Sequence, residues 1–175
     1  NTAFGVNTMA LNSTGSYNTA SGKDTLQKNT TASSSVAFGT AALAMNTTGW
    51  VNSAFGDSAL YSNTTGASST AVGFRSLSNN TTGASTTAIG ALSGYTNTTG
   101  SEVTFIGAGA DANANNLTNA TAIGAKAYVG ASNSLILGSI SGLNGATANV
   151  NVGIGTSSPG SLLSIQGAAN FVSSG

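Results

Sequence analysis

The chain has 175 residues, of which only four are Lys or Arg and four are Asp or Glu, and it contains neither histidine nor cysteine. So little charge leaves no cationic patch for a phosphate backbone or an anionic lipid, so nucleic acid and membrane surfaces are poor candidates as partners. The lack of histidine and cysteine removes the usual general base, the usual transition-metal ligands, thiol nucleophiles and disulfides. The composition therefore favours a structural or binding role over catalysis.

From the N-terminus onward, a glycine recurs with a constant period of 17 through eight copies of one unit. These first glycines are Gly5, Gly22, Gly39, Gly56, Gly73, Gly90, Gly107 and Gly124. Two further copies are marked by Gly138, at a shorter spacing of 14, and by Gly155, where the spacing of 17 returns. A chain rich in Asn, Ser and Thr can also be disordered, but disorder gives no reason for a residue-exact period. The period predicts about ten stacked coils of one repeated structure.

Each unit begins with a strand pattern that ends at the first glycine. The residue directly before that glycine forms a row that we call the Phe/Ile row: Phe4, Phe38, Phe55, Val72, Ile89, Ile106 and Ile123, broken only by Ser21. The residue before it forms the Ala row: Ala3, Ala20, Ala37, Ala54, Ala71, Ala88, Phe105 and Ala122. Successive side chains of a strand point to opposite faces. We expect the Phe/Ile row to form the core and the Ala row to pack against a neighbouring chain.

A second apolar row lies four positions after the first glycine. This Leu row comprises Met9, Leu26, Leu43, Leu60 and Leu77. Apolar alternation around it predicts a second strand, whose inward residues face the Phe/Ile row. A unit of this length, at about 3.3 Å per residue, has a contour of about 56 Å, enough for a flattened coil with two short sides and two turns.

The tetrapeptide "NTTG" occurs at residues 46–49, 63–66, 80–83 and 97–100, which predicts a turn repeated in each coil. We expect its glycine to adopt a left-handed backbone conformation and its asparagine to bond equivalent asparagines in a ladder. The Asn row is Asn12, Asn29, Asn46, Asn63, Asn80 and Asn97.

These patterns predict an all-β protein, a parallel β-solenoid over residues 1–149, followed by a C-terminal exit segment over residues 150–175. The expected core is thin and has no disulfide to supplement it, which indicates that copies of the chain associate with one another.

Residues 119–139, "NATAIGAKAYVGASNSLILGS", resemble the YadA-like head repeats of trimeric autotransporter adhesins. The longer units before them resemble extended versions of that repeat, of the kind seen in bacteriophage tail fibres. Residues 150–167 resemble the exit segment that often precedes a C-terminal trimerisation or chaperone domain. The resemblance implies a left-handed β-roll, a homotrimeric fibre, an extracellular location on a virion tail fibre or a bacterial surface, and attachment to a glycan or protein receptor.

Candidate sites for chemistry are few. The carboxylates Asp24, Asp57, Glu102 and Asp111 occupy different places in their units, so no acid/base pair is assembled, and we expect no metal, cofactor or catalysis. Residues that interrupt the repeat are candidates for contacting a saccharide or receptor, because aromatic faces stack on ligands. They are Tyr17, Trp50, Tyr61, Phe74, Arg75 and Tyr95, and the alternative is that they pack between coils or chains.

The leading functional hypothesis is a structural and adhesive fibre segment. An alternative is an ice-binding solenoid, suggested by the second threonine of each "NTTG", namely Thr48, Thr65, Thr82 and Thr99. The two adjacent threonines of each turn would point to opposite faces of a strand, which weakens that alternative. A polysaccharide-cleaving solenoid enzyme would require clustered acids, which the sequence does not provide.

Overall fold

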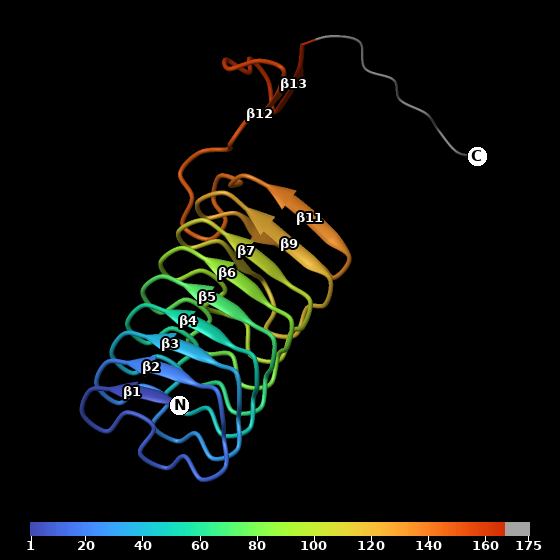
Figure 1. Cartoon of the computed structure of the whole chain (residues 1–175). Coiled ribbons are helices and arrows are strands. Elements are labelled where there is room, and N and C mark those ends of the chain that lie inside the picture. The colour runs from blue at the N-terminus through green and yellow to red at the C-terminus, as the bar shows by residue number, and fades with distance from the viewer. Residues whose placement is uncertain (167–175) are drawn as a thin grey trace.

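The computed structural model describes residues 1–166 and shows a rod of stacked coils (Figure 1). Nine parallel strands form one sheet in chain order, and two short strands between them lie elsewhere in the coil. The sheet strands are β1 (Thr2–Phe4), β2 (Thr19–Ser21), β3 (Val36–Phe38), β4 (Ser53–Phe55), β5 (Thr70–Val72), β6 (Thr87–Ile89), β7 (Thr104–Ile106), β9 (Ala120–Ile123) and β11 (Ser134–Leu137). Within residues 1–166, no helix has the length and hydrophobicity needed to cross a bilayer.

The sequence period appears directly as strand register. Ala54 of β4 pairs with Ala71 of β5, one full period later, whereas Ala120 of β9 pairs with Ser134 of β11, at the shorter spacing of 14. The predicted all-β parallel solenoid with a 17-residue repeat is thereby confirmed. It has about eight turns rather than ten, because β12 (Val152–Ile154), which precedes Gly155, leaves the main sheet and pairs with β13 (Leu163–Ile165).

The expected orientation of the strands was wrong. The Ala row lies inside the coil, where Ala37, Ala54 and Ala71 are fully buried, and the Phe/Ile row points outward. The inward Ala row faces the buried Leu row, represented by Leu43 and Leu60. A leucine from one side leaves room for only a methyl group on the other, since protein interiors are close-packed. The larger residues of each strand therefore lie on the outer face.

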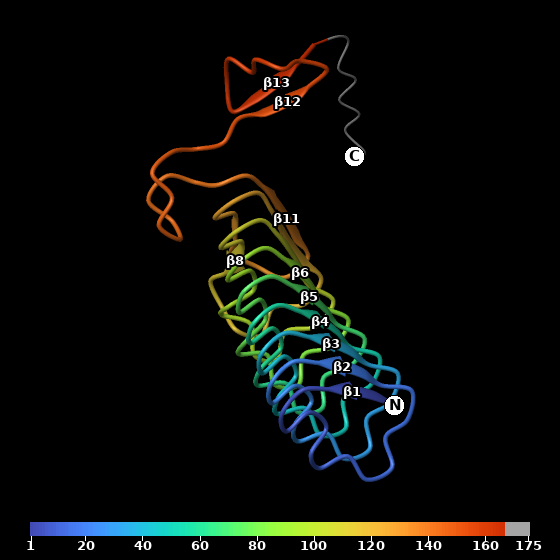
Figure 2. The same cartoon turned by 60° about the vertical axis from the view of Figure 1, so that its left-hand side comes forward.

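The predicted second strand is also wrong for most coils. Residues around the Leu row form turns, and only β8 (Asp111–Ala112) and β10 (Tyr128–Val129) are strands in that part of the coil (Figure 2). The reason lies in the backbone, because Ala41 and Leu43 both have positive φ, at 55° and 52°. Left-handed residues at alternate positions cannot continue a strand. The turns still stack in register, as Leu43 N donates to Ala59 O at 3.0 Å.

The "NTTG" turn needs its glycine for a different reason from the one predicted. Gly49, Gly66 and Gly83 are not in the left-handed region, whereas the first glycines have φ between 121° and 138°. A Cβ at Gly49 would collide with the carbonyl oxygen of Gly66 and approach Asn46 Oδ1 to 2.7 Å. Close approach between coils therefore requires glycine here.

The asparagines of these turns are buried and bonded from coil to coil. Asn63 Nδ2 donates to Asn46 Oδ1 at 2.8 Å and to Gly66 O at 2.8 Å, and Asn63 Oδ1 accepts from Asn80 Nδ2 at 2.9 Å. The same pattern runs from Asn12 to Asn97. Each amide is thus satisfied in the interior, where an unpaired polar group would be costly.

At one place in the core, the large and the small residue of the repeat have changed places. Phe105 occupies an Ala-row position and is fully buried, and Gly94 occupies the Leu-row position of the preceding coil. A Cβ at Gly94 would lie 2.7 Å from Phe105 Cδ2 and 2.9 Å from Leu77 Cδ2. The phenyl ring therefore fills the space that a leucine fills in earlier coils.

Val51 is a strained residue in this turn-rich backbone. Its φ is 55°, a conformation that β-branched residues adopt only with strain, whereas the equivalent position of a later coil is Asn119 at 49°. Replacing Val51 with asparagine is expected to stabilise the protein by about 1 kcal/mol, measured by thermal or urea denaturation. The matched control is Val6→Asn, an exposed valine without positive φ, for which no gain is expected. Equal effects of the two substitutions would contradict the strain.

Beyond β11 the chain turns back on the solenoid before it leaves. Asn144 Nδ2 donates to Gly109 O, and Lys126 Nζ donates to Gly145 O, which anchors this return segment to the last coils. The β12–β13 pair then lies past the end of the stack, as Figures 1 and 2 both show. The predicted exit segment of residues 150–175 extends past the described residues, and its boundary stays a prediction.

Candidate functional site

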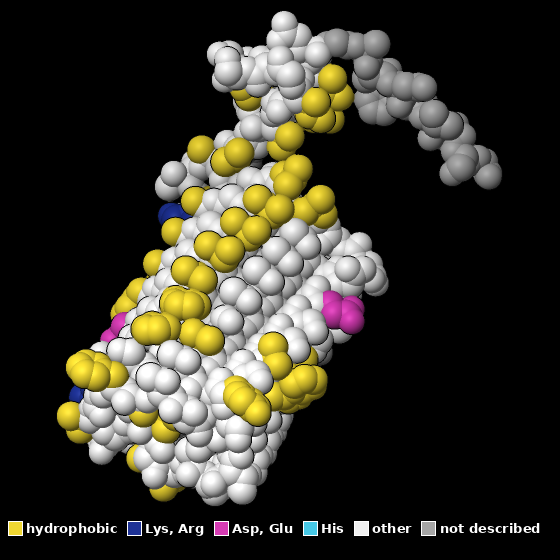
Figure 3. Space-filling model, viewed as in Figure 1, with side chains coloured by type: hydrophobic (Ala, Val, Ile, Leu, Met, Phe, Trp, Pro, Cys, Tyr) yellow, Lys and Arg dark blue, Asp and Glu magenta, His cyan; other side chains and the backbone are white. Residues whose placement is uncertain are grey.

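The outer face of the nine-stranded sheet carries an apolar row that is interrupted only at Ser21. Phe4 is 78% exposed, and from β3 to β11 the row is 37–46% exposed. Its exposed members are Phe4, Phe38, Phe55, Val72, Ile89, Ile106, Ile123 and Leu137. Figure 3 shows this as a band of hydrophobic side chains along the sheet. At about 4.8 Å per strand, nine strands give a band about 38 Å long.

The same face has no charge. A second row, two positions before the Phe/Ile row in each strand, contains half-buried residues such as Thr70, Thr87 and Thr104, and none of the nine strands contains Lys, Arg, Asp or Glu. Phe38 and Phe55 stack on each other with ring centroids 5.5 Å apart and an interplanar angle of 9°. A flat, uncharged and apolar face of this length is typical of an interaction surface. We call it the sheet face.

A second candidate site lies on the turns that follow the strands, where two successive coils form a cavity of about 360 Å³. Its wall includes Tyr61, Phe74 and Arg75, three of the six residues predicted to contact a ligand. A fourth, Tyr95, lies beside them, with its ring centroid 5.4 Å from the Arg75 guanidinium carbon. The remaining wall residues are Asp57, Ser58, Ser78 and Asn79. We call this the aromatic cavity.

The polar groups of the aromatic cavity are only partly engaged. Asp57 accepts one hydrogen bond, from Ser58 Oγ at 2.7 Å, and Asn79 Nδ2 donates to Tyr95 O at 2.9 Å. Within residues 1–166, the one ion pair shorter than 4.0 Å joins Lys23 to Asp24, so Asp57 and Arg75 do not pair. The cavity wall therefore presents one free-standing carboxylate and one guanidinium.

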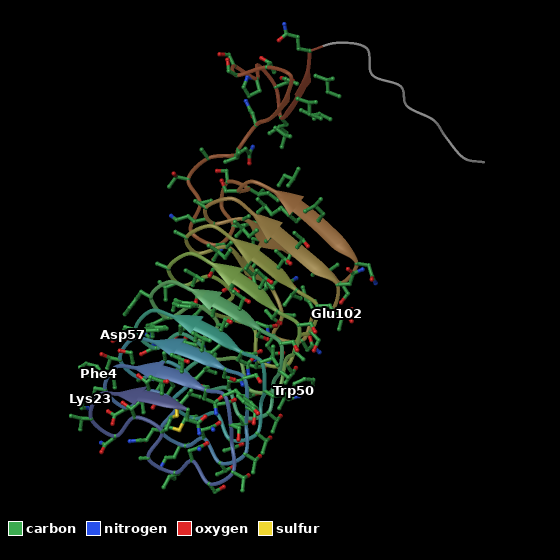
Figure 4. The ribbon with its side chains drawn as sticks, viewed as in Figure 1. Phe4, Lys23, Trp50, Asp57 and Glu102 are labelled. Atoms are coloured by element: carbon green, nitrogen blue, oxygen red, sulfur yellow. The ribbon has the colours of Figure 1, made fainter. Side chains whose placement is uncertain are left out.

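The last two predicted contact residues are not part of this cavity. Figure 4 shows Trp50 at the edge of the coil opposite Asp57. Trp50 is 58% exposed and Tyr17 is 83% exposed. Neither side chain belongs to the wall of the aromatic cavity, and neither makes an aromatic pair within the described chain. The structure thus gathers four of the six predicted residues and leaves these two apart.

Asp111 is a buried carboxylate that was named from the sequence but assigned to no site. It occupies the Leu-row position of its coil and lines another cavity, of about 440 Å³, together with Tyr95 and Lys126. Its carboxylate accepts hydrogen bonds from Thr96 Oγ1 at 2.8 Å, from Thr96 N at 3.1 Å and from Ala112 N at 2.9 Å. Burial raises the pKa of Asp111 above its ordinary value of 3.8, and these hydrogen bonds oppose the rise without cancelling it.

A raised pKa has a defined effect on stability. The folded protein binds the Asp111 proton more tightly than the unfolded chain does, and this difference stabilises the folded protein. The stabilisation is complete below pH 3.8 and is lost as the pH rises through the raised pKa of Asp111 in the folded protein. Asp111→Asn is expected to abolish that loss, because an amide can still accept from Ala112 N and donate to Thr96 Oγ1. Thermal melts from pH 3 to 7 would therefore show a flatter profile for Asp111→Asn.

Asp24 provides a control of opposite sign. A hydrogen bond from the Lys23 ammonium, and a second from the Asn7 amide, hold the pKa of this exposed carboxyl below its ordinary value. Asp24 thus contributes stability above pH 3.8 that is lost as the pH falls. Asp24→Asn should lower stability at neutral pH and leave the Asp111 effect intact. Similar profiles for the two variants would contradict the assignment.

Several residues of the aromatic cavity were named from the sequence, but it was not predicted that they share one site, although the period itself could have shown this. Arg75 lies one period after Ser58, and Tyr61, Ser78 and Tyr95 follow one another at the same period, so stacking alone brings them together. Asp57 and Phe74 are likewise one period apart. Within residues 1–166, no group of three or more His, Cys, Asp or Glu side chains is placed to hold a metal ion.

Comparison of the chain with models of protein families, with curated proteins and with solved structures finds no match in any of the three.

Proposed function

We propose that the chain is a segment of a structural and adhesive fibre, a phage tail-fibre shaft or a bacterial surface adhesin, in which copies of the chain associate through the sheet face. The observation that carries the proposal is the exposed, uncharged Phe/Ile row along the sheet. Burying apolar area on this scale favours association, by about 25 cal/mol per Å² before the costs of ordering.

The association surface in this proposal differs from the one that the sequence suggested. The Ala row is already buried inside the coil, so it has no surface left to offer. Three flat sheet faces arranged around a common axis would enclose the Phe/Ile rows, in line with the homotrimer implied by the resemblance of the repeats. A rod of identical chains would then present its turns outward in several copies, which gives attachment by avidity.

Oligomeric state tests the proposal directly. Sedimentation equilibrium and cross-linking should find a trimer for the wild-type chain, and Ile89→Asp should convert it to a monomer, because a charge in a buried apolar seam lacks a partner. The matched control is Ser85→Asp, an exposed residue outside the nine strands, which should remain trimeric. Circular dichroism checks that both variants keep their strands. A monomeric wild-type chain would refute the proposal.

The sheet face also supports a second candidate, an ice-binding solenoid. The threonines that matter are not those of the "NTTG" turns but Thr70, Thr87, Thr104 and Thr121, which share the outer face with Val72, Ile89, Ile106 and Ile123. Hydroxyl and methyl groups then repeat on one flat face at the strand spacing of about 4.8 Å. Thermal hysteresis in the wild type that Thr87→Asp abolishes would favour this function, and its absence would remove it.

A further inference from the structure

We propose that the aromatic cavity binds a neutral saccharide, with Tyr61 and Phe74 as stacking surfaces and with Asp57, Arg75 and Asn79 as hydrogen-bonding groups to sugar hydroxyls. This inference rests on the proposed adhesive function and names the ligand class of one site on the fibre.

The apolar part of the site comes from two rings on adjacent coils. Tyr61 follows Asp57 within one coil, and Phe74 lies in the next coil, one period after Asp57. Tyr61 is 37% exposed and Phe74 is 51% exposed, although both line a cavity of about 360 Å³. Aromatic faces of this kind pack against the C–H groups of a sugar ring, while the polar groups around them fix its orientation.

The polar part of the site has unused capacity. The Asp57 carboxylate receives one hydrogen bond, although a carboxylate has about four acceptor positions. Asn79 uses an N–H toward Tyr95 O, which leaves its carbonyl oxygen as an acceptor. The Arg75 guanidinium is held by the Tyr95 ring and has no carboxylate partner among residues 1–166. Ser78 Oγ, in the cavity wall, is buried and lacks a hydrogen-bond partner in the same part of the chain.

Charge decides between neutral and anionic ligands. The wall contains one carboxylate, on Asp57, and one guanidinium, on Arg75, so their formal charges cancel. An anionic polymer would be repelled by Asp57 as much as it is attracted by Arg75. Sugar hydroxyls can both donate to a carboxylate and accept from a guanidinium, so a neutral saccharide uses both groups.

The backbone argues against a peptide as the occupant. The main-chain N–H groups of Ser58, Arg75 and Ser78 already donate to Thr40 O, Asp57 O and Arg75 O. A peptide recognised through its backbone needs a free strand edge or free main-chain groups. This wall offers side-chain groups instead, which suits a polyhydroxylated ligand.

The experiment uses affinity chromatography of the native chain on columns that carry mannan, dextran, soluble starch, a β-glucan or galactomannan as neutral probes, with alginate and gelatin as anionic and peptide probes. At least one neutral probe should retard the wild type. Asp57→Asn and Phe74→Ala should each weaken that retardation by about tenfold, since a charge-assisted hydrogen bond or a stacking surface is lost. The matched control is Trp50→Ala, an exposed aromatic on the opposite edge, which should bind like the wild type.

Several outcomes would overturn the assignment. They are no retardation by any neutral probe, retardation only by alginate or gelatin, or equal binding by Asp57→Asn, Phe74→Ala and the wild type. Oligomeric state is measured in the same samples, so the fibre proposal and the cavity proposal are tested independently of each other. A trimer that binds no neutral saccharide refutes only the cavity assignment, and a monomer that binds one refutes only the fibre.

Discussion

Replacing Phe105 with alanine is expected to lower the free energy of unfolding by about 3–5 kcal/mol, the usual cost of removing a fully buried phenyl ring. The ring is enclosed between Ala88 and Ala122 on the adjacent strands and lies against the position of Gly94. The Leu-row position that would otherwise supply a side chain to this space is occupied by Gly94. Urea denaturation followed by circular dichroism would measure the loss.

The stronger test is rescue. In earlier coils the core is formed by a leucine that faces an alanine, so Gly94→Leu should restore most of the stability lost in Phe105→Ala. Leucine is compatible with the backbone there, because Gly94 has φ of 63° and Leu77 already adopts 49°. Alone, Gly94→Leu should destabilise the protein, since its Cβ would lie 2.7 Å from Phe105 Cδ2.

A double-mutant cycle should therefore give a coupling energy of about 2 kcal/mol or more, well above the few tenths expected of independent sites. The control pair is Phe55→Ala with Gly94→Leu, because Phe55 lies on the sheet face and does not reach this space. Additive effects of Phe105→Ala and Gly94→Leu would show that the two side chains do not fill the same space.

The strand register could be predicted from the sequence, whereas the inner face of the strands could not be predicted from alternation alone. The period of 17 predicts parallel strands in register, and the structure pairs Thr70 with Thr87 and Ala71 with Ala88 accordingly. Alternation did not identify the inner face, because it places the Ala row and the Phe/Ile row on opposite faces of the strand without showing which face is buried. Hydrophobicity alone favoured the larger residues for the core, whereas the available volume favoured the alanines.

The decisive sequence clue lay in Phe105 and Gly94. Among the eight units of constant period, one has glycine at the Leu-row position, and the coil that follows it has a large residue in the Ala row. This indicates that the two rows face each other. The false second strand has a related cause, because an apolar alternation such as that of residues 42–45 is the same for a strand and for a turn with left-handed residues. Side-chain pattern does not report φ.

The candidate sites, too, could be predicted only in part from the sequence. Residues that interrupt a repeat are visible in the sequence, and the spacing of 17 already places Phe74 beside Asp57. Whether these residues share a cavity depends on which side chains of the coil point outward. The inner and outer rows of the strands were predicted the wrong way round, so the shared cavity was not predicted. Trp50 interrupts the repeat equally clearly but lies on the opposite edge (Figure 4).

The second large effect is expected in the Asn ladder. Replacing Asn63 with aspartate keeps the shape of the side chain but removes the amide that donates to Asn46 Oδ1 and Gly66 O, both at 2.8 Å. Asn46 Oδ1 loses its donor, at a cost of about 1–3 kcal/mol, and Gly66 O keeps only the hydrogen bond from Asn52 Nδ2 at 2.8 Å. The introduced carboxylate also lies next to both of these acceptors in a buried turn. We expect Asn63→Asp to lower the free energy of unfolding by about 3–5 kcal/mol at pH 7.

The end of the ladder supplies the matched control. Asn12 is only partly buried and donates to a single acceptor, Gly15 O at 3.0 Å, while it accepts from Asn29 Nδ2 at 2.6 Å. Asn12→Asp should cost about 1 kcal/mol, because solvent can hydrate the partly buried carboxylate and Gly15 O keeps its hydrogen bond from Asn1 Nδ2 at 2.7 Å. Lowering the pH should restore part of the stability of Asn63→Asp, since a protonated carboxyl can again donate one hydrogen bond. If both variants lose equal stability and respond equally to pH, the coil-to-coil amide bonds contribute no more to the interior than a solvated turn does.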